Sequence, residues 1–371
     1  MCINFSRQQV LSNTKNKVQL DAMLVESLLD ADFYCYATQT HYLTLAGVND
    51  APIQISSGVK IDRHDLCSKH EEADVIIAQH DISSSIIGSS VNVVCDDTDV
   101  FVLLVHFYDR NCKETNGPMI MSSPVKERAV IDIRATASAH KNIAKDILAI
   151  HGLSGEDTVA LLHGIGKPTI ANAFKKGNFP LFAIGDVNAD LKSVETQAIK
   201  LICPSYGKIT ATCNSMTEYR VKSWRMRTAR AGTSSMKLCT MPRTNEAFYE
   251  NLLRCHFQVA IWKSALDEVP PNLDPLEYGW EQDHEDMLIP RTVAAGTLSA
   301  PNAIIQLIHC KCKSSGCRTA TCSCSKLGCT MFCHCEGGEQ CQNPLTRNDP
   351  ADEEEIDESN DNGIDRLEVT D

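Results

Sequence analysis

Hydrophobic residues in the first 139 positions follow two different periods along the chain. At residues 17–29 and 70–83 they recur at helical spacing, whereas 91–95 is a short continuous apolar run of the kind found in buried strands. Residues 100–107 continue as a helix or a second apolar element. Further strands are predicted at 32–37 and, as a hairpin, at 118–123 with 128–135. Strands alternating with helices are typical of an α/β sheet covered by helices, so residues 1–139 predict an α/β core.

From residue 140 onward the pattern becomes helical. Residues 140–153 are amphipathic, and 155–176 predict a helix, a Gly-Ile-Gly turn at 164–166 and a second helix that starts near Pro168. Further helices are predicted at 191–203, 215–230 and 244–266. We therefore expect residues 140–267 to form a helical region that contains a helix–hairpin–helix.

The C-terminal part changes in composition. Residues 268–307 are rich in Pro, Asp and Glu and predict an extended linker, 308–343 are rich in cysteine, and 344–371 form an acidic tail. Residues 349–371 carry eleven acidic residues and one basic residue, so they hold −10 of the net charge of −13 and leave −3 for the rest. The composition predicts a disordered tail on a nearly neutral folded protein, which does not exclude a nucleic-acid partner.

No apolar run approaches the roughly 18 to 20 residues that a membrane span requires, and the basic N-terminus lacks the apolar core of a signal peptide. Nine of the 18 cysteines are scattered without paired spacing, as in the reduced core of an intracellular protein. The other nine lie between His309 and Asn343: Cys310, Cys312, Cys317, Cys322, Cys324, Cys329, Cys333, Cys335 and Cys341. At this density cysteines form disulfides or bind metal. Their odd number and the interleaved Lys residues favour metal over a disulfide knot.

Zinc is the metal that this spacing predicts. Three of the gaps are C-x-C, which is too short for relaxed chelation of one tetrahedral ion, so the two sulfurs of a pair go to different ions. Three tetrahedral Zn²⁺ have twelve coordination positions, which six terminal and three bridging thiolates fill. Such a cluster carries a charge of −3, which nearby basic residues can offset: Lys311, Lys313, Arg318 and Lys326. We expect a structural cluster of three zinc ions.

Acidic residues form a second group with chemical potential. Asp96, Asp97 and Asp99 follow the predicted strand 91–95, and the carboxyl end of a strand is where sites assemble in α/β sheets. Glu72 and Asp74, also two residues apart, could join them. Carboxylates around one cleft need cations between them, and Mg²⁺ or Mn²⁺ suits all-oxygen ligands. Two such ions would activate water and stabilise the leaving oxygen in phosphodiester hydrolysis. The alternative is that these acids only cap helices.

A third group consists of glycines and basic residues. The turn Gly164-Ile-Gly166, followed by Lys167, offers backbone N–H groups to a phosphate, although many helical hairpins turn on glycine. Downstream, basic and aromatic residues are interleaved: Lys208, Arg220, Lys222, Arg225, Arg227 and Arg230 with Tyr206, Tyr219 and Trp224. This mixture suits a nucleic-acid backbone with stacked bases. The alternatives are core packing for Trp224 and a solvated face for the Arg residues.

Together these residues resemble a known family. The order Glu72-Ala-Asp74, Asp97-Thr-Asp99, Gly155-Glu-Asp157 and Gly164-Ile-Gly166 is similar to that of the flap-endonuclease superfamily. Combined with the terminal cysteines and the segments HEEAD, DTDVFVLL, HGLSGEDTVALLHGIGK, MPRTNEAF and GW, it resembles transposon-associated animal proteins that join such a nuclease-like domain to a tesmin-type CXC zinc domain. The resemblance covers about residues 64–343.

The resemblance implies a PIN-like three-layer α/β sandwich with a helical extension and a small zinc domain at residues 308–343. It implies catalytic, metal-binding roles for Glu72, Asp74, Asp97, Asp99 and Asp157. It implies contacts to DNA phosphates by Gly164, Gly166 and Lys167 in the hairpin and by Lys311, Lys313 and Arg318 in the zinc domain. DNA is then the expected partner, the nucleus the expected location, and no small-molecule cofactor or membrane is expected.

Two departures from the family leave catalysis open. Nucleases of this type also take an Asp from a first strand, and no strand followed by Asp precedes Ala31, because Asp21 lies in a predicted helix. Either the chain begins inside the fold or the site has decayed. CXC domains that read DNA also have a Tyr before the fourth cysteine, where this chain has Thr321. The two hypotheses are a metal-dependent DNA phosphodiesterase and a non-catalytic chromatin or transcription regulator with a degenerate nuclease-like domain.

Overall fold

The structure is a computed structural model that describes residues 13–30, 52–56, 59–113, 115–125, 128–177, 179–206, 213–230, 241–293, 309–312, 317, 322, 324, 328–330, 333–335, 341–343 and 345. The chain divides into two compact units, residues 1–222 with 242–295 and residues 223–241 with 296–371. Several predicted features lie outside the described residues: the strand at 32–37, Lys313, Arg318, Thr321 and the acidic tail except for Leu345.

The first unit opens with helix α2 (Thr14–Asp30) and an antiparallel pair of strands, β1 (Ile53–Ser56) and β2 (Val59–Asp62). Helix α2 agrees with the helix predicted at 17–29, and the β1–β2 pair was not predicted. Leu20, Met23 and Leu24, three of the apolar side chains behind that prediction, are exposed. The helix therefore buries little of its apolar face within the described part of the chain.

A three-stranded sheet organises the region that follows. Strand β3 (Val91–Val94) pairs in parallel with β4 (Met119–Ser122), and β4 pairs antiparallel with the short β5 (Ile131–Asp132), in the order β3-β4-β5. Val91 and Val93 are buried while Asn92 and Val94 are exposed, the alternation of a strand with one covered face. The strand at 91–95 and the β4–β5 hairpin were both predicted from the apolar pattern.

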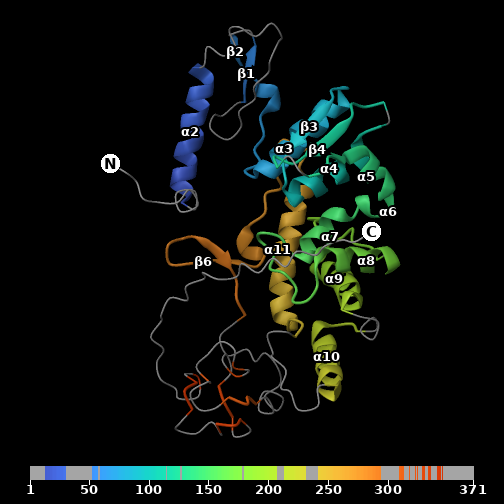
Figure 1. Cartoon of the computed structure of the whole chain (residues 1–371), viewed down its shortest axis with the longest axis vertical. Coiled ribbons are helices and arrows are strands. Elements are labelled where there is room, and N and C mark those ends of the chain that lie inside the picture. Colours follow the sequence, from blue (N-terminus) through green and yellow to red (C-terminus); the bar gives the residue numbers. More distant parts are fainter. Residues whose placement is uncertain are drawn as a thin grey trace. The chain divides into compact units, whose positions relative to one another are not determined.

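Helix α4 (Thr98–Asn111) is the buried centre of this region and packs against α3 (Ala73–Ile86), α5 (Ile133–Ala139) and α7 (Ile147–Ser154). Every residue of α4 from Val102 to Tyr108 is buried, which explains why its sequence reads as a continuous apolar run rather than as a one-sided helix. The expectation of a mixed α/β core is confirmed in these coarse features (Figure 1).

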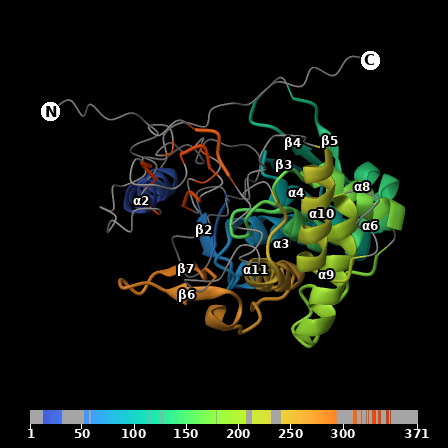
Figure 2. The same cartoon turned by 90° about the horizontal axis from the view of Figure 1, so that it is seen from below.

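The remaining helices of the first unit extend the same hydrophobic core, which runs from Val75 to Ala265. They are α6 (Lys141–Ala144), α8 (Lys167–Gly177), α9 (Leu191–Ser205), α10 (Met216–Arg230), whose last turns belong to the second unit, and α11 (Asn245–Lys263). Helix α11, seen end-on in Figure 2, packs against α7 and α9 and buries Trp262 to 1% exposure. The predicted helices at 191–203, 215–230 and 244–266 are confirmed.

The predicted helix at 155–163 is wrong. Helix α7 ends at Ser154, and residues 155–166 form turns and irregular backbone before α8 begins at Lys167. Gly155 has φ +101, a left-handed conformation that ends a helix. The Asn251 side chain accepts a hydrogen bond from the Ala160 backbone N–H at 3.0 Å, and so occupies a donor that a helix would have used.

Residues 268–293 contain more regular structure than the predicted extended linker. They form a short turn of 3-10 helix, η5 (Pro275–Glu277), and an antiparallel hairpin of β6 (Trp280–Gln282) and β7 (Leu288–Pro290). The Arg254 guanidinium on α11 donates to the Gly279 carbonyl at 2.7 Å, which holds the start of the hairpin against α11. Within the described ranges no helix is long and apolar enough to cross a membrane.

Candidate metal centres

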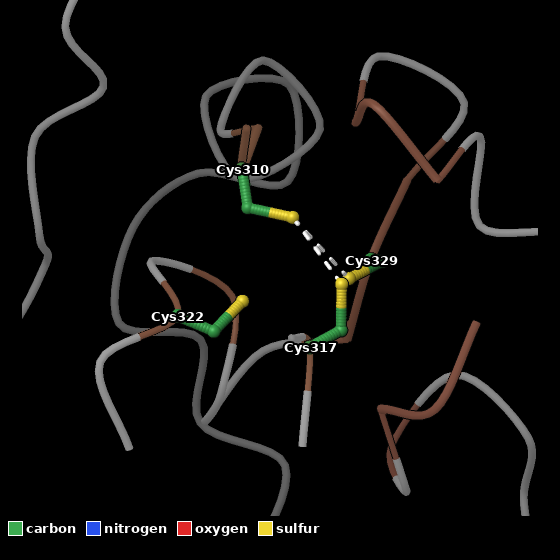
Figure 3. A group of neighbouring side chains, drawn as sticks. All are labelled: Cys310, Cys317, Cys322 and Cys329. Atoms are coloured by element: carbon green, nitrogen blue, oxygen red, sulfur yellow. Dashed lines mark hydrogen bonds between the residues drawn. The ribbon is translucent and has the colours of Figure 1, made fainter. Parts of the chain in front are cut away.

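The cysteine-rich segment of the second unit gathers all nine predicted sulfur ligands into one cluster. Three groups of four have sulfur atoms that all lie within 4.8 Å of one another: Cys310, Cys317, Cys322 and Cys329; Cys310, Cys329, Cys333 and Cys335; Cys317, Cys329, Cys335 and Cys341. Four of these cysteines belong to more than one group, as bridging ligands would. Figure 3 shows the first group with its sulfur atoms turned toward one another.

The sulfur separations have the length that zinc coordination requires. Four ligands at a Zn–S distance of about 2.3 Å define a tetrahedron whose edges are about 3.8 Å long. The sulfur of Cys310 lies 3.7 Å from that of Cys317 and 3.8 Å from that of Cys329, and the Cys324 and Cys333 sulfurs are 3.6 Å apart. A disulfide needs about 2.05 Å, so these distances fit shared cations and not covalent pairs. The cluster is compatible with zinc.

The surrounding backbone favours thiolates. Backbone N–H groups of Cys310 and Thr330 point at the Cys333 sulfur at 3.4 and 3.3 Å. Buried Asn343, which sequence reasoning missed, donates its side-chain amide to the Cys324 carbonyl at 2.6 Å and lies 3.6 Å from the Cys329 sulfur. Such contacts to ligands fix their orientation. Asn343 lies two residues after the last cysteine, but nothing in that spacing predicts its role.

The thiols need a cation to ionise. Burial, with the neighbouring Cys322 and Cys310 thiols, raises the pKa of Cys312 to about 11, and burial raises the pKa of the Cys317, Cys324 and Cys329 thiols as well. Without a cation these groups would hold their protons at neutral pH. Zinc binding would therefore release protons, and its affinity would fall with falling pH.

The second candidate centre lies in the first unit, at the carboxyl end of β3. Asp97 precedes α4, Asp99 is in its first turn, and Asp74 is in the first turn of α3. Their carboxylates lie within 4.8 Å of one another, a separation at which one divalent cation can contact all three. Of the strand-end acids, the structure brings Asp97 and Asp99, but not Asp96, together with Asp74. The acidic triad, Asp74 with Asp97 and Asp99, is compatible with a metal site.

The helix-capping alternative also describes part of the arrangement. The Asp97 side chain accepts a hydrogen bond from the Asp99 backbone N–H at 2.8 Å and so caps α4, whereas Glu72 occupies the cap position of α3 without a capping bond. Asp96 faces elsewhere, because its carboxylate accepts from Ser123 at 2.9 Å and pairs with Arg128 at 3.1 Å. Asp97 therefore both caps α4 and belongs to the acidic triad, whereas Asp96 does neither.

Electrostatic repulsion marks Asp74 as the residue that most needs a cation. Burial first, and then the charges of Asp97, Asp99, Glu72 and Asp157 in that order, together raise its pKa to about 6. All four other acids of the predicted catalytic set therefore act on this carboxylate. A divalent cation would offset this repulsion between the carboxylates.

Two of the predicted acids lie outside the triad. The Glu72 carboxylate accepts hydrogen bonds from the Gln258 amide on α11, at 2.7 and 2.9 Å, and burial raises its pKa. Asp157 is exposed in the loop after α7, next to Glu156, whose carboxylate accepts from the Thr158 hydroxyl at 2.6 Å. Glu72 and Asp157 thus act on the triad only through their charges, which raise the pKa of Asp74, and their roles as ligands stay predictions.

His151 on α7 is the neighbour of the triad that sequence reasoning missed. This ring is 5% exposed, and its Nε2 lies 2.6 Å from a carboxylate oxygen of Asp99. Burial alone would raise the pKa of Asp99, but the hydrogen bond from His151, its charge and that of Lys167 lower it overall. Lys167 reaches the same place, with its amine 3.1 Å from the Thr98 hydroxyl and 3.5 Å from His151 Nε2. In the sequence, the only signal for His151 was its position as a polar residue in an apolar helix.

The glycine turn at 164–166 lies just before α8. Gly164 has φ +73 with open space where a side chain would lie, and the Gly166 carbonyl accepts from the Thr169 N–H at 3.0 Å, the first hydrogen bond of α8. Both glycines are exposed, so backbone is accessible there. Lys167, however, points toward the acidic triad. The phosphate contacts of Gly164 and Gly166 stay predictions.

The structure shows what several residues of the basic and aromatic segment after the glycine turn contact. Tyr219 is buried, and its ring lies 4.7 Å from that of Tyr206, so this pair serves core packing. Arg220 donates to the Pro242 carbonyl and Lys222 pairs with Glu218 at 2.7 Å. These contacts agree better with a solvated helix face whose basic side chains bond to the protein itself than with a surface on which nucleic-acid bases stack. Lys208 lies outside the described residues.

Comparison with protein-family models, with curated proteins and with solved structures found no match. The resemblance to flap-endonuclease-like and CXC-containing proteins therefore remains a prediction that rests on the motif residues and on the geometry of the two candidate metal centres.

Proposed function

We propose that the protein is a zinc-containing DNA-binding protein whose acidic triad catalyses divalent-metal-dependent hydrolysis of phosphodiester bonds. The observation that supports it most is the convergence of Asp74, Asp97 and Asp99 within 4.8 Å, with the pKa of Asp74 raised to about 6 by burial and by the other acids. Asp97 and Asp99 at the end of a parallel strand, with Asp74 beside them, would offer a cation three carboxylates. The DNA substrate rests on the motif resemblance alone.

The residues of the chain have distinct tasks in this proposal. Asp74, Asp97 and Asp99 would hold Mg²⁺ or Mn²⁺, and the bound cation would activate water and stabilise the leaving oxygen. His151 fixes one Asp99 oxygen through its 2.6 Å hydrogen bond, and the Asp97 side chain is oriented by the N–H of Asp99. Lys167 places a positive charge beside the triad, where it would bind a non-bridging phosphate oxygen of the scissile bond.

The zinc cluster would act as an anchor for DNA. Lys311 is exposed between two of the cysteines, and a lysine on a rigid knob can contact phosphates irrespective of base sequence. Zinc would hold the segment together, because its nine cysteines form one cluster among the described residues. Lys313 and Arg318 would share this role.

A non-catalytic regulator is the second candidate, and the contacts of Asp99 favour it. Lys167 already supplies positive charge at the triad and His151 bonds Asp99, as protein groups do where an acidic cluster is structural. The triad would then be held by the chain itself, and only the zinc domain would bind nucleic acid. The two candidates make opposite predictions for the effect of added divalent cation.

A cleavage assay separates these candidates. We expect the full-length, zinc-loaded chain to cut flapped or branched DNA with Mg²⁺ or Mn²⁺, and Asp97→Asn to lose activity by at least about a hundredfold, since a metal ligand loses its charge. Asparagine keeps the capping acceptor, so α4 should remain intact. Asp96→Asn is the matched control, because Asp96 is adjacent but bonded to Ser123 and Arg128.

Absence of cleavage with either cation, or equal activity in wild type and Asp97→Asn, would rule out the catalytic proposal. DNA binding is tested separately by fluorescence anisotropy before and after zinc removal. Affinity that survives complete removal of zinc would rule out the anchoring role of the cysteine-rich segment.

A further inference from the structure

A cavity of about 340 Å³ lies in the first unit and has no role in the function proposed above. Its walls come from the end of α4, from residues 145–149, from residues 179–182 and from the end of α11. Helix α4 has 14 residues and is therefore about 20 Å long, with Asp99 in its first turn and Arg110 in its last. The cavity and the acidic triad thus lie at opposite ends of the same helix.

Basic side chains predominate among the charged groups that line this cavity. Arg110, Lys145 and Lys263 face Asp146, the only acid among the lining residues. Within the part of the chain that the structure describes, none of the three cations forms an ion pair. A helix dipole accounts for one cation in the last turn of α4 and one in that of α11. It does not account for the meeting of three cations from separate elements at one cavity.

Lys263 is the cation that the protein holds most firmly. Its amine donates to the Ile184 carbonyl at 2.6 Å and to the Phe182 carbonyl at 3.2 Å. An ammonium group has three hydrogens, so one remains for a further acceptor. Burial lowers the pKa of this amine, the charges of Asp186 and Asp146 oppose that change, and Arg110 adds to it. An anion in the cavity would offset both the burial and the repulsion from Arg110.

Buried His106 positions the Arg110 guanidinium. The Nδ1 of His106 lies 3.0 Å from the Ala144 carbonyl, and because a carbonyl only accepts, Nδ1 carries the proton and Nε2 of the neutral ring is an acceptor. Burial lowers the pKa of His106 to about 4, which keeps the ring neutral at pH 7. One guanidinium nitrogen of Arg110 lies 3.5 Å from this Nε2. The other nitrogens have no partner among the described residues and are available to an anion.

Apolar side chains complete the lining of the cavity. They are Ala149, Phe179, Pro180, Leu181 and Phe182. The Phe182 side chain is 68% exposed, although the bond from Lys263 holds its backbone carbonyl in place. The volume of the cavity lies at the lower end of the range of natural small-ligand sites. A phosphate group alone would leave part of this volume empty, so the ligand that fits has an apolar body as well as an anionic group.

We propose that this cavity binds a small phosphomonoester, with its phosphate group on Arg110, Lys145 and Lys263 and its apolar or aromatic body against Phe179 and Phe182. Guanidinium and ammonium groups form strong, charge-assisted hydrogen bonds to phosphate oxygens. A phosphomonoester carries about two negative charges at pH 7, whereas each phosphate of a nucleic-acid strand carries one. Three cations against one acid therefore favour the monoester. The site is separate from the triad and does not depend on catalysis there.

Isothermal calorimetry on the full-length, zinc-loaded chain tests the proposal, with phenyl phosphate as the probe. We expect a Kd below about 1 mM, and binding at least about tenfold tighter than that of inorganic phosphate, because only phenyl phosphate has a ring to bury against the apolar wall. Benzenesulfonate keeps the ring but carries a single negative charge. It should therefore bind at least about fivefold more weakly than phenyl phosphate.

Variants at exposed positions locate the binding site without disturbing the core. The double variant Arg110→Gln with Lys145→Gln should weaken phenyl phosphate by at least about tenfold, since two of the three cations are lost. Lys141→Gln is the matched control, because Lys141 is exposed one turn before Lys145 and does not line the cavity. It should leave the affinity unchanged. Phe182→Ala should remove the preference for phenyl phosphate and leave inorganic phosphate binding as it is.

Three results would overturn the proposal. One is a Kd for phenyl phosphate above about 1 mM, or an equal affinity in the Arg110 and Lys145 double variant. Another is equal affinity for phenyl phosphate and benzenesulfonate, which would make the cavity a general anion site. The third is displacement of phenyl phosphate by an oligothymidine without a terminal phosphate, which would assign the cavity to a nucleic-acid backbone. Asp97→Asn should keep phenyl phosphate binding whether or not the triad cleaves DNA.

Discussion

Single residues at the triad satisfy two demands at once, and Asp97 is the clearest case. Its carboxylate caps α4 through the Asp99 N–H at 2.8 Å and lies within 4.8 Å of the other two acids. The sequence left capping and metal binding as alternatives, although an acid at a helix N-terminus is favourable for both. Asp97 can do both because it lies between the end of β3 and the start of α4, beside the first turn of α3.

The pH dependence of stability follows from Asp74. Its folded-state pKa of about 6 lies above the ordinary value of 3.8, so the folded protein holds this proton more tightly than the unfolded chain. Stability contributed by that proton is lost as pH rises through 6. We expect Asp74→Asn to raise the Tm of the cation-free protein at pH 7.5 by about 2–4 °C, after allowance for solvent screening of a half-buried group, and by less at pH 5.

Asp81 gives the matched control for this experiment. It lies on the same helix, and burial alone raises its pKa to about 6, with no neighbouring acid involved. Asp81→Asn should therefore flatten the pH dependence in the same way. Added Mn²⁺ should raise the Tm of wild type and of Asp81→Asn but not of Asp74→Asn. An equal response to Mn²⁺ in all three proteins would contradict a cation site at the triad.

What the sequence could predict at the residue scale depends on whether the signal is local. Asp97 and Asp99 are two apart after an apolar run, and the nine cysteines repeat at short intervals, so both groups are visible without the structure. His151 meets Asp99 from 52 positions away and Gln258 meets Glu72 from 186 away. No local pattern records such contacts, because they depend on how α7 and α11 pack.

At the scale of elements, apolar periodicity predicted α3, β3, α9, α10 and α11, whereas residues 100–107, which lie in α4, were left open as a helix or a second apolar element. It failed at residues 155–163, where Thr158 to Leu162 look helical. Those residues turn because Gly155 adopts φ +101, because Asn251 takes the Ala160 N–H, and because Arg243 donates to the Ala160 and Leu161 carbonyls at 3.1 and 2.9 Å. Tertiary hydrogen bonds outweighed local helix preference here.

The loop between α7 and α8 should depend on Gly155. A side chain there faces a left-handed backbone and a Leu161 atom at 2.6 Å, so we expect Gly155→Ala to lower the free energy of unfolding by about 2–4 kcal/mol. Gly164→Ala and Gly88→Ala share the positive φ, at +73 and +94, but have open space, so they should cost only about 1–2 kcal/mol. Urea denaturation compares the three.

Equal losses in all three glycine variants would show that the contact with Leu161 has no effect and that backbone conformation alone decides the cost. A larger loss in Gly155→Ala would also bear on the site, because Asp157 lies two residues along the same loop and adds to the charge that raises the pKa of Asp74.

For the whole molecule, the two units obtain their stability by different means. The first has a hydrophobic core that runs from Val75 to Ala265, with its largest fully buried side chain at Trp262. In the second, the described part of the cysteine-rich segment packs its nine cysteines into a cluster of their own. A mixed α/β fold and a metal-dependent terminal segment could both be predicted from composition and period. The finer identity of either could not, because fold topology depends on non-local packing and the choice of metal on ligand geometry.

Removal of zinc should therefore separate the behaviour of the two units. Elemental analysis of the purified chain should give three zinc ions per molecule, one for each of the three overlapping groups of four, which share seven of the nine cysteines. A strong chelator should unfold the cysteine-rich segment, because its described residues pack around the cysteine cluster, and should leave the far-UV circular dichroism of the helical first unit nearly unchanged. Cys329, which belongs to all three groups, is the most sensitive position: Cys329→Ser should lower the zinc content by at least two ions, whereas Cys322→Ser, a member of one group, should lower it by one at most. Retention of full zinc content in Cys329→Ser, or loss of the helical signal of the first unit on chelation, would contradict a shared-thiolate cluster that stabilises only its own segment.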